Sequence, residues 1–255
     1  MTTKHLIVTL LSALTCISAQ AQTSFGDAMK FDDGWLFSLT DAPDQKDNSF
    51  NDKDWRTLDL PHDWSIEGRL SPTLASCTGY LPAGIGWYRK HFTVNDDAPR
   101  HYIYFEGVYN RSEVYLNGQL LGKRPNGYVS FMYDLTPYLK DGENVLAVRV
   151  DHSRYADSRW YTGSGIYRDV WLVSAPETHF SLWGVGWHAK SITENQATVS
   201  VDMEIQKHMA VQSKLEVKAS LYDAGNNLVA SRTIAVNDRE AGLSKVATEL
   251  RVKNP

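Results

Sequence analysis

The sequence is poor in cysteine and has no excess of basic residues. Its only cysteines are Cys16 and Cys77, and its formal charge is −4. Cys16 lies in a segment that we expect to be removed on export. Cys77 would then remain alone, which excludes an intramolecular disulfide in the exported chain. The mild negative charge disfavours a nucleic-acid partner, because binding to phosphates calls for a basic face.

Helical, metal-binding and phosphate-binding patterns are also missing. After residue 22, no window keeps a long apolar repeat at i, i+3, i+4 and i+7, which argues against a helical fold. The eight histidines show no ligand spacing such as His-x-x-x-His, and no Gly-rich loop leads from a strand into a helix. No second apolar run of membrane length follows the N-terminal one. We therefore expect no cofactor, no metal site and no membrane partner.

The N-terminus has the features of a secretion signal. A short basic start precedes an apolar run over residues 6–17, and residues 19–21 (Ala-Gln-Ala) match the small-x-small pattern that signal peptidase cleaves. The run is too short to serve comfortably as a membrane anchor. We predict a signal peptide over residues 1–21, Gln22 as the mature N-terminus, and export to the periplasm or the cell exterior.

Short β-forming runs separated by turn signals dominate the rest of the chain. Residues 112–116 form one such run and are followed by Asn117-Gly118, the strongest short-range hairpin signal. Further strands are expected at residues 101–105, 145–150 and 169–173. Short strands with regular turns are typical of β-sandwiches. The pattern therefore predicts an all-β chain that begins, after the signal, with a jelly-roll β-sandwich over residues 22–175.

A domain boundary is predicted near Pro176, which lacks an N–H and fits poorly inside a central strand. Alternating runs restart beyond it, at residues 197–205, 214–222, 228–236 and 243–252. They predict a second, smaller sandwich of the immunoglobulin-like type over residues 177–255. Because such sandwiches usually have about seven strands, we expect this one to be incomplete, with its last strands in a following segment.

Several motifs follow one another in the first domain in a specific order. They are residues 60–64 (Leu-Pro-His-Asp-Trp), 78–89 (Thr-Gly-Tyr-Leu-Pro-Ala-Gly-Ile-Gly-Trp-Tyr-Arg), 105–109 (Phe-Glu-Gly-Val-Tyr), 114–118 (Val-Tyr-Leu-Asn-Gly) and 157–170 (Asp-Ser-Arg-Trp-Tyr-Thr-Gly-Ser-Gly-Ile-Tyr-Arg-Asp-Val). In order and spacing, these motifs resemble the N-terminal sugar-binding domain of glycoside hydrolase family 2, in its β-galactosidase branch. The resemblance is strong over residues 30–175. It is weak over residues 177–255, which resemble the immunoglobulin-like second domain of that family.

This resemblance implies an accessory part of a retaining exo-β-glycosidase. Family members cleave the glycosidic bond with two glutamates of a TIM barrel, and such a barrel needs about 200 residues of its own. The sequence has no βα alternation that could supply one. We therefore expect no catalytic residue in this chain and no activity from the chain alone. Its expected partners are a terminal β-linked sugar, with a galactoside favoured, and a barrel outside this chain.

The family also implies that a loop near the end of the first domain reaches the sugar in the barrel mouth. In residues 151–165, the candidate substrate-binding residues are Asp157, Arg159 and Trp160. A carboxylate can accept two hydroxyl hydrogen bonds, a guanidinium can donate to the same sugar, and an indole offers a face for stacking. Alternatives remain open: Asp157 could form a local turn, and Trp160 could pack in the core.

Two other functions compete with the enzyme reading. A stand-alone carbohydrate-binding module would bind sugar without a barrel. A structural domain that mediates contacts in a homo-oligomer would bind none.

Overall fold

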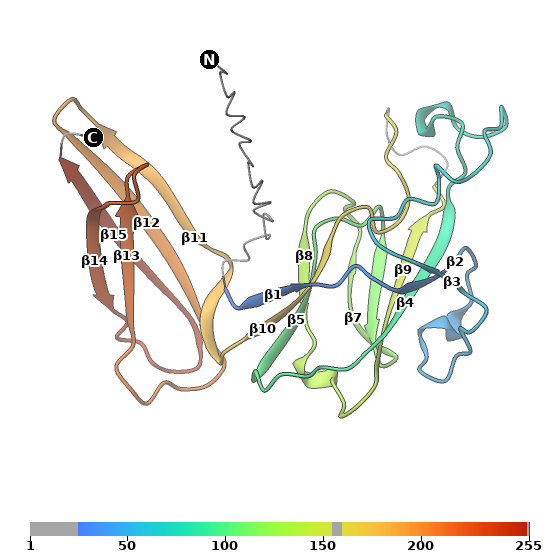
Figure 1. The fold of residues 1–255 in the computed structure, drawn as a ribbon, viewed down its shortest axis with the longest axis horizontal. Coiled ribbons are helices and arrows are strands. Elements are labelled where there is room, and N and C mark those ends of the chain that lie inside the picture. Colours follow the sequence, from blue (N-terminus) through green and yellow to red (C-terminus); the bar gives the residue numbers. More distant parts are fainter. Residues whose placement is uncertain (1–24, 155–159, 254) are drawn as a thin grey trace, which may run out of the picture.

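The computed structural model describes residues 25–154, 160–253 and 255. These residues form fifteen strands and three short 3₁₀-helices, η1 (Pro43–Lys46), η2 (Ser76–Thr78) and η3 (Thr136–Tyr138). Strands β1–β10 and strands β11–β15 form two bodies that lie side by side (Figure 1). The prediction of an all-β chain built from sandwiches is confirmed. No described helix is long and apolar enough to cross a membrane.

The first body is a sandwich of two antiparallel sheets. The larger sheet runs in the order β3 (Arg56–Leu58), β2 (Trp35–Ser38), β4 (Gly84–Phe92), β9 (Asn144–His152), β6 (Ser112–Leu116) and β7 (Gln119–Arg124). The smaller sheet runs in the order β1 (Asp27–Lys30), β10 (Val170–Ala175), β5 (Arg100–Phe105) and β8 (Phe131–Asp134).

The predicted hairpin at Asn117-Gly118 joins β6 to β7. Both residues have positive φ, 52° and 80°, as a type I′ turn requires. The turn lies at the C-terminal end of β6. The candidate functional site lies at the opposite end of this strand, near Ser112.

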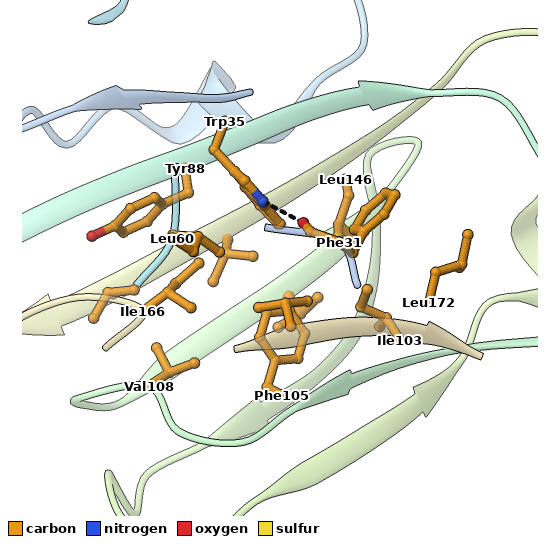
Figure 2. Close-up of a cluster of buried hydrophobic side chains, with 14 of the residues drawn as sticks. Phe31, Trp35, Leu60, Tyr88, Ile103, Phe105, Val108, Leu146, Ile166 and Leu172 are labelled. Atoms are coloured by element: carbon orange, nitrogen blue, oxygen red, sulfur yellow. Dashed lines mark hydrogen bonds between the residues drawn. The ribbon is translucent and has the colours of Figure 1, made fainter. Parts of the chain in front are cut away.

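The main core fills the space between the two sheets (Figure 2). The larger sheet contributes Trp35, Tyr88 and Leu146, and the smaller sheet contributes Ile103 and Phe105. All five residues are fully buried. The indole Nε1 of Trp35 donates a hydrogen bond to the backbone oxygen of Phe31 at 2.8 Å, so the polar edge of this buried ring is satisfied.

The two central strands of the smaller sheet, β5 and β10, are buried on both faces. Ile103 and Phe105 point into the main core, whereas Tyr102 and Tyr104 belong to a second cluster on the opposite face. Neighbouring strand residues point to opposite faces, so the unbroken apolar run of β5 requires two covers. Phe180, from the second body, packs against this second cluster.

A buried ion pair anchors the loop that covers the outer face of the larger sheet. Arg89 of β4 is fully buried; its Nε donates to Asp52 Oδ2 and its Nη1 to the backbone oxygen of Gln45, both at 2.6 Å. His91 Nε2 lies 2.8 Å from the same Asp52 oxygen. Burial raises the pKa of Asp52, but the hydrogen bonds from His91 and Arg89 outweigh it and leave that pKa below its usual value.

The second body pairs a three-stranded sheet with a hairpin. The sheet runs in the order β11 (Thr178–Ile192), β12 (Gln196–Lys207) and β15 (Gly242–Lys253), and the hairpin consists of β13 (Glu216–Tyr222) and β14 (Leu228–Ala235). Its core is small, with Met203, Ile205, Val217 and Val236 as the buried residues.

The two bodies meet at a hydrogen-bonded relay. His179 Nδ1 donates to the Phe180 backbone oxygen at 2.8 Å, so its Nε2 accepts from the Tyr102 hydroxyl at 3.1 Å. The same hydroxyl oxygen lies 2.8 Å from His208 Nε2, which can then donate to it. Burial, followed by the charge of Arg100, lowers the pKa of His208, which favours the neutral imidazole that this relay uses.

Replacing Asp52 tests the anchor on the outer sheet face. Asp52→Ala leaves the buried Arg89 guanidinium without its carboxylate, and we expect the free energy of unfolding in urea to fall by about 3–5 kcal/mol. Asp47→Ala is the matched control: it removes an exposed carboxylate, 2.8 Å from Lys46, and we expect a loss of about 1 kcal/mol or less. Equal losses from the two variants would contradict this account.

Candidate functional site

The candidate site is the end of the first body where residues 162–166 run between two other segments. On one side, His62 N donates to Ile166 O at 2.8 Å and Trp64 N donates to Ser164 O at 3.1 Å. On the other side, Tyr109 and Gly165 exchange two backbone hydrogen bonds of 2.9 Å. The segment is therefore held on both edges, like a short strand in a sheet.

Glycine is required at Gly165. Its φ is +125°, and a Cβ there would collide with the Tyr88 hydroxyl and lie 2.7 Å from the backbone oxygen of His62. A side chain would force these segments apart. The second glycine of the Gly-Ser-Gly pattern at residues 163–165 is therefore required by the close approach of these segments.

The carboxylate of Asp63 clamps the same segment. Its Oδ1 accepts from the backbone N–H of Ser65 at 2.9 Å and of Ser164 at 2.8 Å, and its Oδ2 accepts from the Tyr161 hydroxyl. Burial, followed by the hydrogen bond to Asp63, raises the pKa of Tyr161, so the phenol stays protonated and donates. Asp63 therefore positions the loop, as a turn-forming aspartate does.

A serine–histidine pair lies behind this segment, but it is not an activated nucleophile. Ser65 Oγ donates to Pro82 O at 2.7 Å, so it accepts from Ser164 Oγ at 2.6 Å. Ser164 Oγ must then accept from His152 Nδ1, also at 2.6 Å. His152 donates a hydrogen bond to the Ser164 hydroxyl, and both side chains are buried. His152 therefore cannot act as a general base that removes the Ser164 proton.

A second histidine, His62, lies at the base of the site, and hydrogen bonds hold its ring in one orientation. Arg56 Nη2 donates to His62 Nε2 at 2.8 Å, so His62 Nδ1 donates to the Tyr88 hydroxyl at 2.7 Å. Burial lowers the pKa of His62 and favours the neutral ring that this arrangement needs. The acidic residue beside it, Glu67, accepts from Arg56 Nη2 at 2.7 Å.

Exposed aromatic rings form the outer surface of this end. Trp160 is 60% exposed and Tyr128 is 48% exposed, and the indole Nε1 of Trp160 donates to the Tyr128 hydroxyl oxygen at 2.9 Å. Packing of Trp160 in the core, the alternative left open by the sequence, is therefore wrong. An exposed indole can offer its face to the C–H groups of a sugar.

The other two predicted substrate-binding residues, Asp157 and Arg159, lie outside the described residues. The sequence singled out Trp160 but not Tyr128, which lies 32 positions away in the loop between β7 and β8. The one local sequence signal near Tyr128 is Asn126-Gly127, a dipeptide typical of turns.

The carboxylates placed at this end are clamps rather than catalytic groups. Retaining hydrolysis uses a pair of carboxyl groups about 5–5.5 Å apart, one as nucleophile and one as acid. Here Asp63 holds backbone N–H groups, Glu67 pairs with Arg56, and Asp151 accepts from both the N–H and the hydroxyl of Ser153. Among the described residues, no group of three His, Cys, Asp or Glu side chains could hold a metal ion.

Comparisons with known proteins find a matching family model and relatives that are glycosidases. The model of the sugar binding domain of glycosyl hydrolases family 2 matches residues 29–176. The chain is 44% identical over 248 residues to the β-galactosidase BoGH2A of Bacteroides ovatus, and 38% identical over 229 residues to a putative β-glucuronidase of Formosa agariphila. It covers 29% and 21% of these two proteins, while 95% and 88% of the chain is matched.

Solved structures agree with the sequence matches. A β-glycosidase from Bacteroides vulgatus superposes with a TM-score of 0.80 at 39% identity, covering 90% of this chain and 30% of that one. A glycosyl hydrolase family 2 member from Bacteroides cellulosilyticus gives a TM-score of 0.80 at 32% identity, with 89% and 32% covered. The chain thus spans about a third or less of the relatives it matches.

Removal of the Asp63 clamp should release residues 162–166. In Asp63→Ala, we expect the Ser164 amide to exchange its hydrogen at least about tenfold faster, because a hydrogen bond to a charged acceptor is worth about 1.5–3 kcal/mol. Hydrogen exchange followed by mass spectrometry measures this. Asp97→Ala, an exposed carboxylate elsewhere on the first body, serves as the control. An unchanged rate at Ser164 would show that the clamp does not hold the segment.

Proposed function

This chain belongs to glycosyl hydrolases family 2, and from that premise we propose that it is the N-terminal part of an exported, retaining exo-β-glycosidase. In this proposal the chain braces a catalytic barrel and completes its sugar pocket, and the barrel supplies both catalytic carboxyl groups. The substrate is a glycan with a terminal β-linked galactose. The single observation that carries the proposal is the match of nearly the whole chain to under a third of a β-galactosidase.

The site geometry supports an accessory role. Three clamps, at Asp63, Ser164 and His62, fix the loop end, and the exposed rings of Trp160 and Tyr128 lie on it. A rigid support with an exposed aromatic surface suits sugar binding, because a side chain fixed in advance loses little entropy when the sugar binds. We propose that Asp157 and Arg159 bind hydroxyl groups of the same sugar.

The division of the chain is part of the proposal. We place a jelly-roll domain over residues 22–175 and an immunoglobulin-like domain over residues 177–255. The change from β10 to β11 around Pro176 and the separate small core of the second body support this division.

The test compares this chain with the protein encoded by its complete reading frame. We expect the 255-residue chain to release no nitrophenol from nitrophenyl β-galactoside, and the complete protein to turn it over. Nitrophenyl β-glucuronide is the second substrate, since relatives carry both names. Turnover by the 255-residue chain, or a complete protein inactive on both substrates, would refute the proposed function.

The export proposal has a separate readout. When the gene is expressed with its native N-terminus in a Gram-negative host, we expect the periplasmic product to begin at Gln22, as the small-x-small pattern at residues 19–21 predicts. N-terminal sequencing or intact-mass measurement decides this. A product that stays in the cytosol and begins at Met1 or Thr2 would contradict it.

A further inference from the structure

We propose that a charged groove on the outer face of the larger sheet binds the anionic groups of an acidic glycan, which are uronate carboxylates or sulfate esters. The groove is lined by side chains of β4, β9, β6 and β7 and by the loop between β2 and β3. It lies on a face of the first body, whereas the candidate functional site lies at one end. This inference therefore goes beyond the proposed function.

The floor of the groove is a row of four side chains on four neighbouring strands. Strand register pairs Arg149 of β9 with Trp87 of β4 on one side and with Glu113 of β6 on the other. Glu113 is paired in turn with Lys123 of β7. The neighbours of this row along the strands, among them Tyr88, belong to the main core, so the row itself faces outward. At about 4.8 Å per strand, the row is about 14 Å long.

Two adjoining cavities open along this row. One, of about 270 Å³, lies between the row and the loop residues Asp41 and Lys46. The other, of about 380 Å³, extends to Lys123 on the edge strand of the sheet. Arg149 and Glu113 line both cavities, so the two form one continuous groove.

The loop that forms one wall of the groove is held in place. The carboxylate of Asp41 accepts from Arg149 Nε and Nη2, both at 2.8 Å, and from the indole Nε1 of Trp87 at 3.1 Å. The hydrogen bond from Arg149 lowers the pKa of Asp41, so this carboxylate stays charged. The buried Arg89 holds the same loop through the backbone oxygen of Gln45. The Arg149 guanidinium is therefore oriented before any ligand arrives.

The other two carboxylates of the groove are also occupied by protein donors. Glu113 accepts from Lys123 Nζ at 2.7 Å and from the Tyr115 hydroxyl. Asp151 accepts from the backbone N–H and the hydroxyl of Ser153. The carboxylates of the groove therefore do not depend on a ligand for their hydrogen bonds.

The cations of the groove keep donors that no described residue accepts. Arg149 Nη1 lies 3.7 Å from Asp151 Oδ2, which is beyond hydrogen-bond distance. Lys46 and Lys123 each donate one hydrogen bond to a neighbouring carboxylate, at 2.8 Å and 2.7 Å, although an ammonium has three N–H groups. The unused hydrogen-bonding capacity of the groove is thus mainly that of positively charged donors, which suits an anionic acceptor.

The ring of Tyr115 adds apolar surface to these donors. It is stacked on the indole of Trp87, with ring centroids 5.8 Å apart and planes 24° apart, and it lines the same cavity as Lys46 and Arg149. The C–H groups of a pyranose pack on aromatic rings. A groove that joins such a ring to cationic donors therefore suits a sugar that carries a carboxylate or a sulfate.

The test measures binding to the 255-residue chain by isothermal titration calorimetry. The probes are an oligomer of galacturonic acid, a sulfated galactan oligosaccharide of the same length, and the neutral galactan oligosaccharide as the uncharged match. We expect at least one acidic oligosaccharide to bind, with an affinity that falls as salt is added. We expect the neutral one to bind at least about tenfold more weakly. The acidic probe that binds identifies the anion as carboxylate, sulfate or both.

Lys123→Gln removes one of the cations at the groove. We expect it to weaken binding of the acidic oligosaccharide by about two- to fivefold, as for loss of an exposed ion pair. Lys190→Gln in the second body is the matched control, because both lysine side chains are 61% exposed and each pairs with one glutamate, at 2.7 Å and 2.6 Å. We expect this control to leave the affinity unchanged. A purely structural role for Lys123 would lower the thermal midpoint without changing the affinity.

The inference is overturned if neither acidic oligosaccharide binds, if the neutral one binds as tightly, or if Lys123→Gln and Lys190→Gln bind alike. Equally tight binding of an oligoglutamate peptide would also overturn it, because the groove would then select negative charge without a sugar. These outcomes are distinct from a failure of the proposed function, which is tested by turnover in the complete protein.

Discussion

The candidate site depends on the backbone pairing that holds residues 162–166 between the His62–Trp64 segment and Tyr109. This pairing brings together parts of the chain that are about 50 to 100 positions apart, and it leaves no room for a side chain at Gly165. Asp63, Ser65 and His152 add hydrogen bonds to the same segment. Every one of these clamps is buried or half-buried and bound by protein groups. The described residues at this end of the molecule therefore form a rigid support.

In the accessory role proposed for this chain, this rigidity favours sugar binding. An accessory domain that completes a sugar pocket must hold its side chains in place before the sugar arrives, or the cost of ordering them is subtracted from binding. The main core provides the platform, since Tyr88 belongs to it and also accepts from His62 in the floor of the site. The contacts that stabilise the main core therefore also position the side chains of the candidate site.

Much of the fold could be predicted from the sequence, where the signal is local. The strand at residues 112–116 and the turn at Asn117-Gly118 are found as predicted, because alternation and positive-φ residues act over a few positions. Strand β11 was not predicted. Its residues 183–189 alternate between apolar side chains and glycine or polar residues, but a register shift between Phe180 and Val185 breaks this pattern from the first part of the strand, and many of its side chains are exposed.

The site was harder to predict for a related reason. Trp160 lies in a recognisable motif, whereas Tyr128 lies in a loop whose only local signal is a turn. Their hydrogen bond joins residues 32 positions apart. The two loops are brought together by long-range contacts, among them the packing of Gly127 on Tyr109 and the pairing of Tyr109 with Gly165. The role of Asp63 could not be predicted from its neighbours in the sequence either. A carboxylate beside a tryptophan can bind a substrate or hold a loop in place. The hydrogen bond that Asp63 accepts from the backbone N–H of Ser164, 101 positions away, shows that it holds the loop.

The most direct test of the central claim is to locate the catalytic nucleophile. A mechanism-based glycosidase inhibitor that forms a covalent glycosyl–enzyme adduct would be incubated with the protein encoded by the complete reading frame, and the labelled peptide would be identified by mass spectrometry. We expect a labelled glutamate beyond Pro255. A label on any carboxylate within residues 22–255 would contradict it.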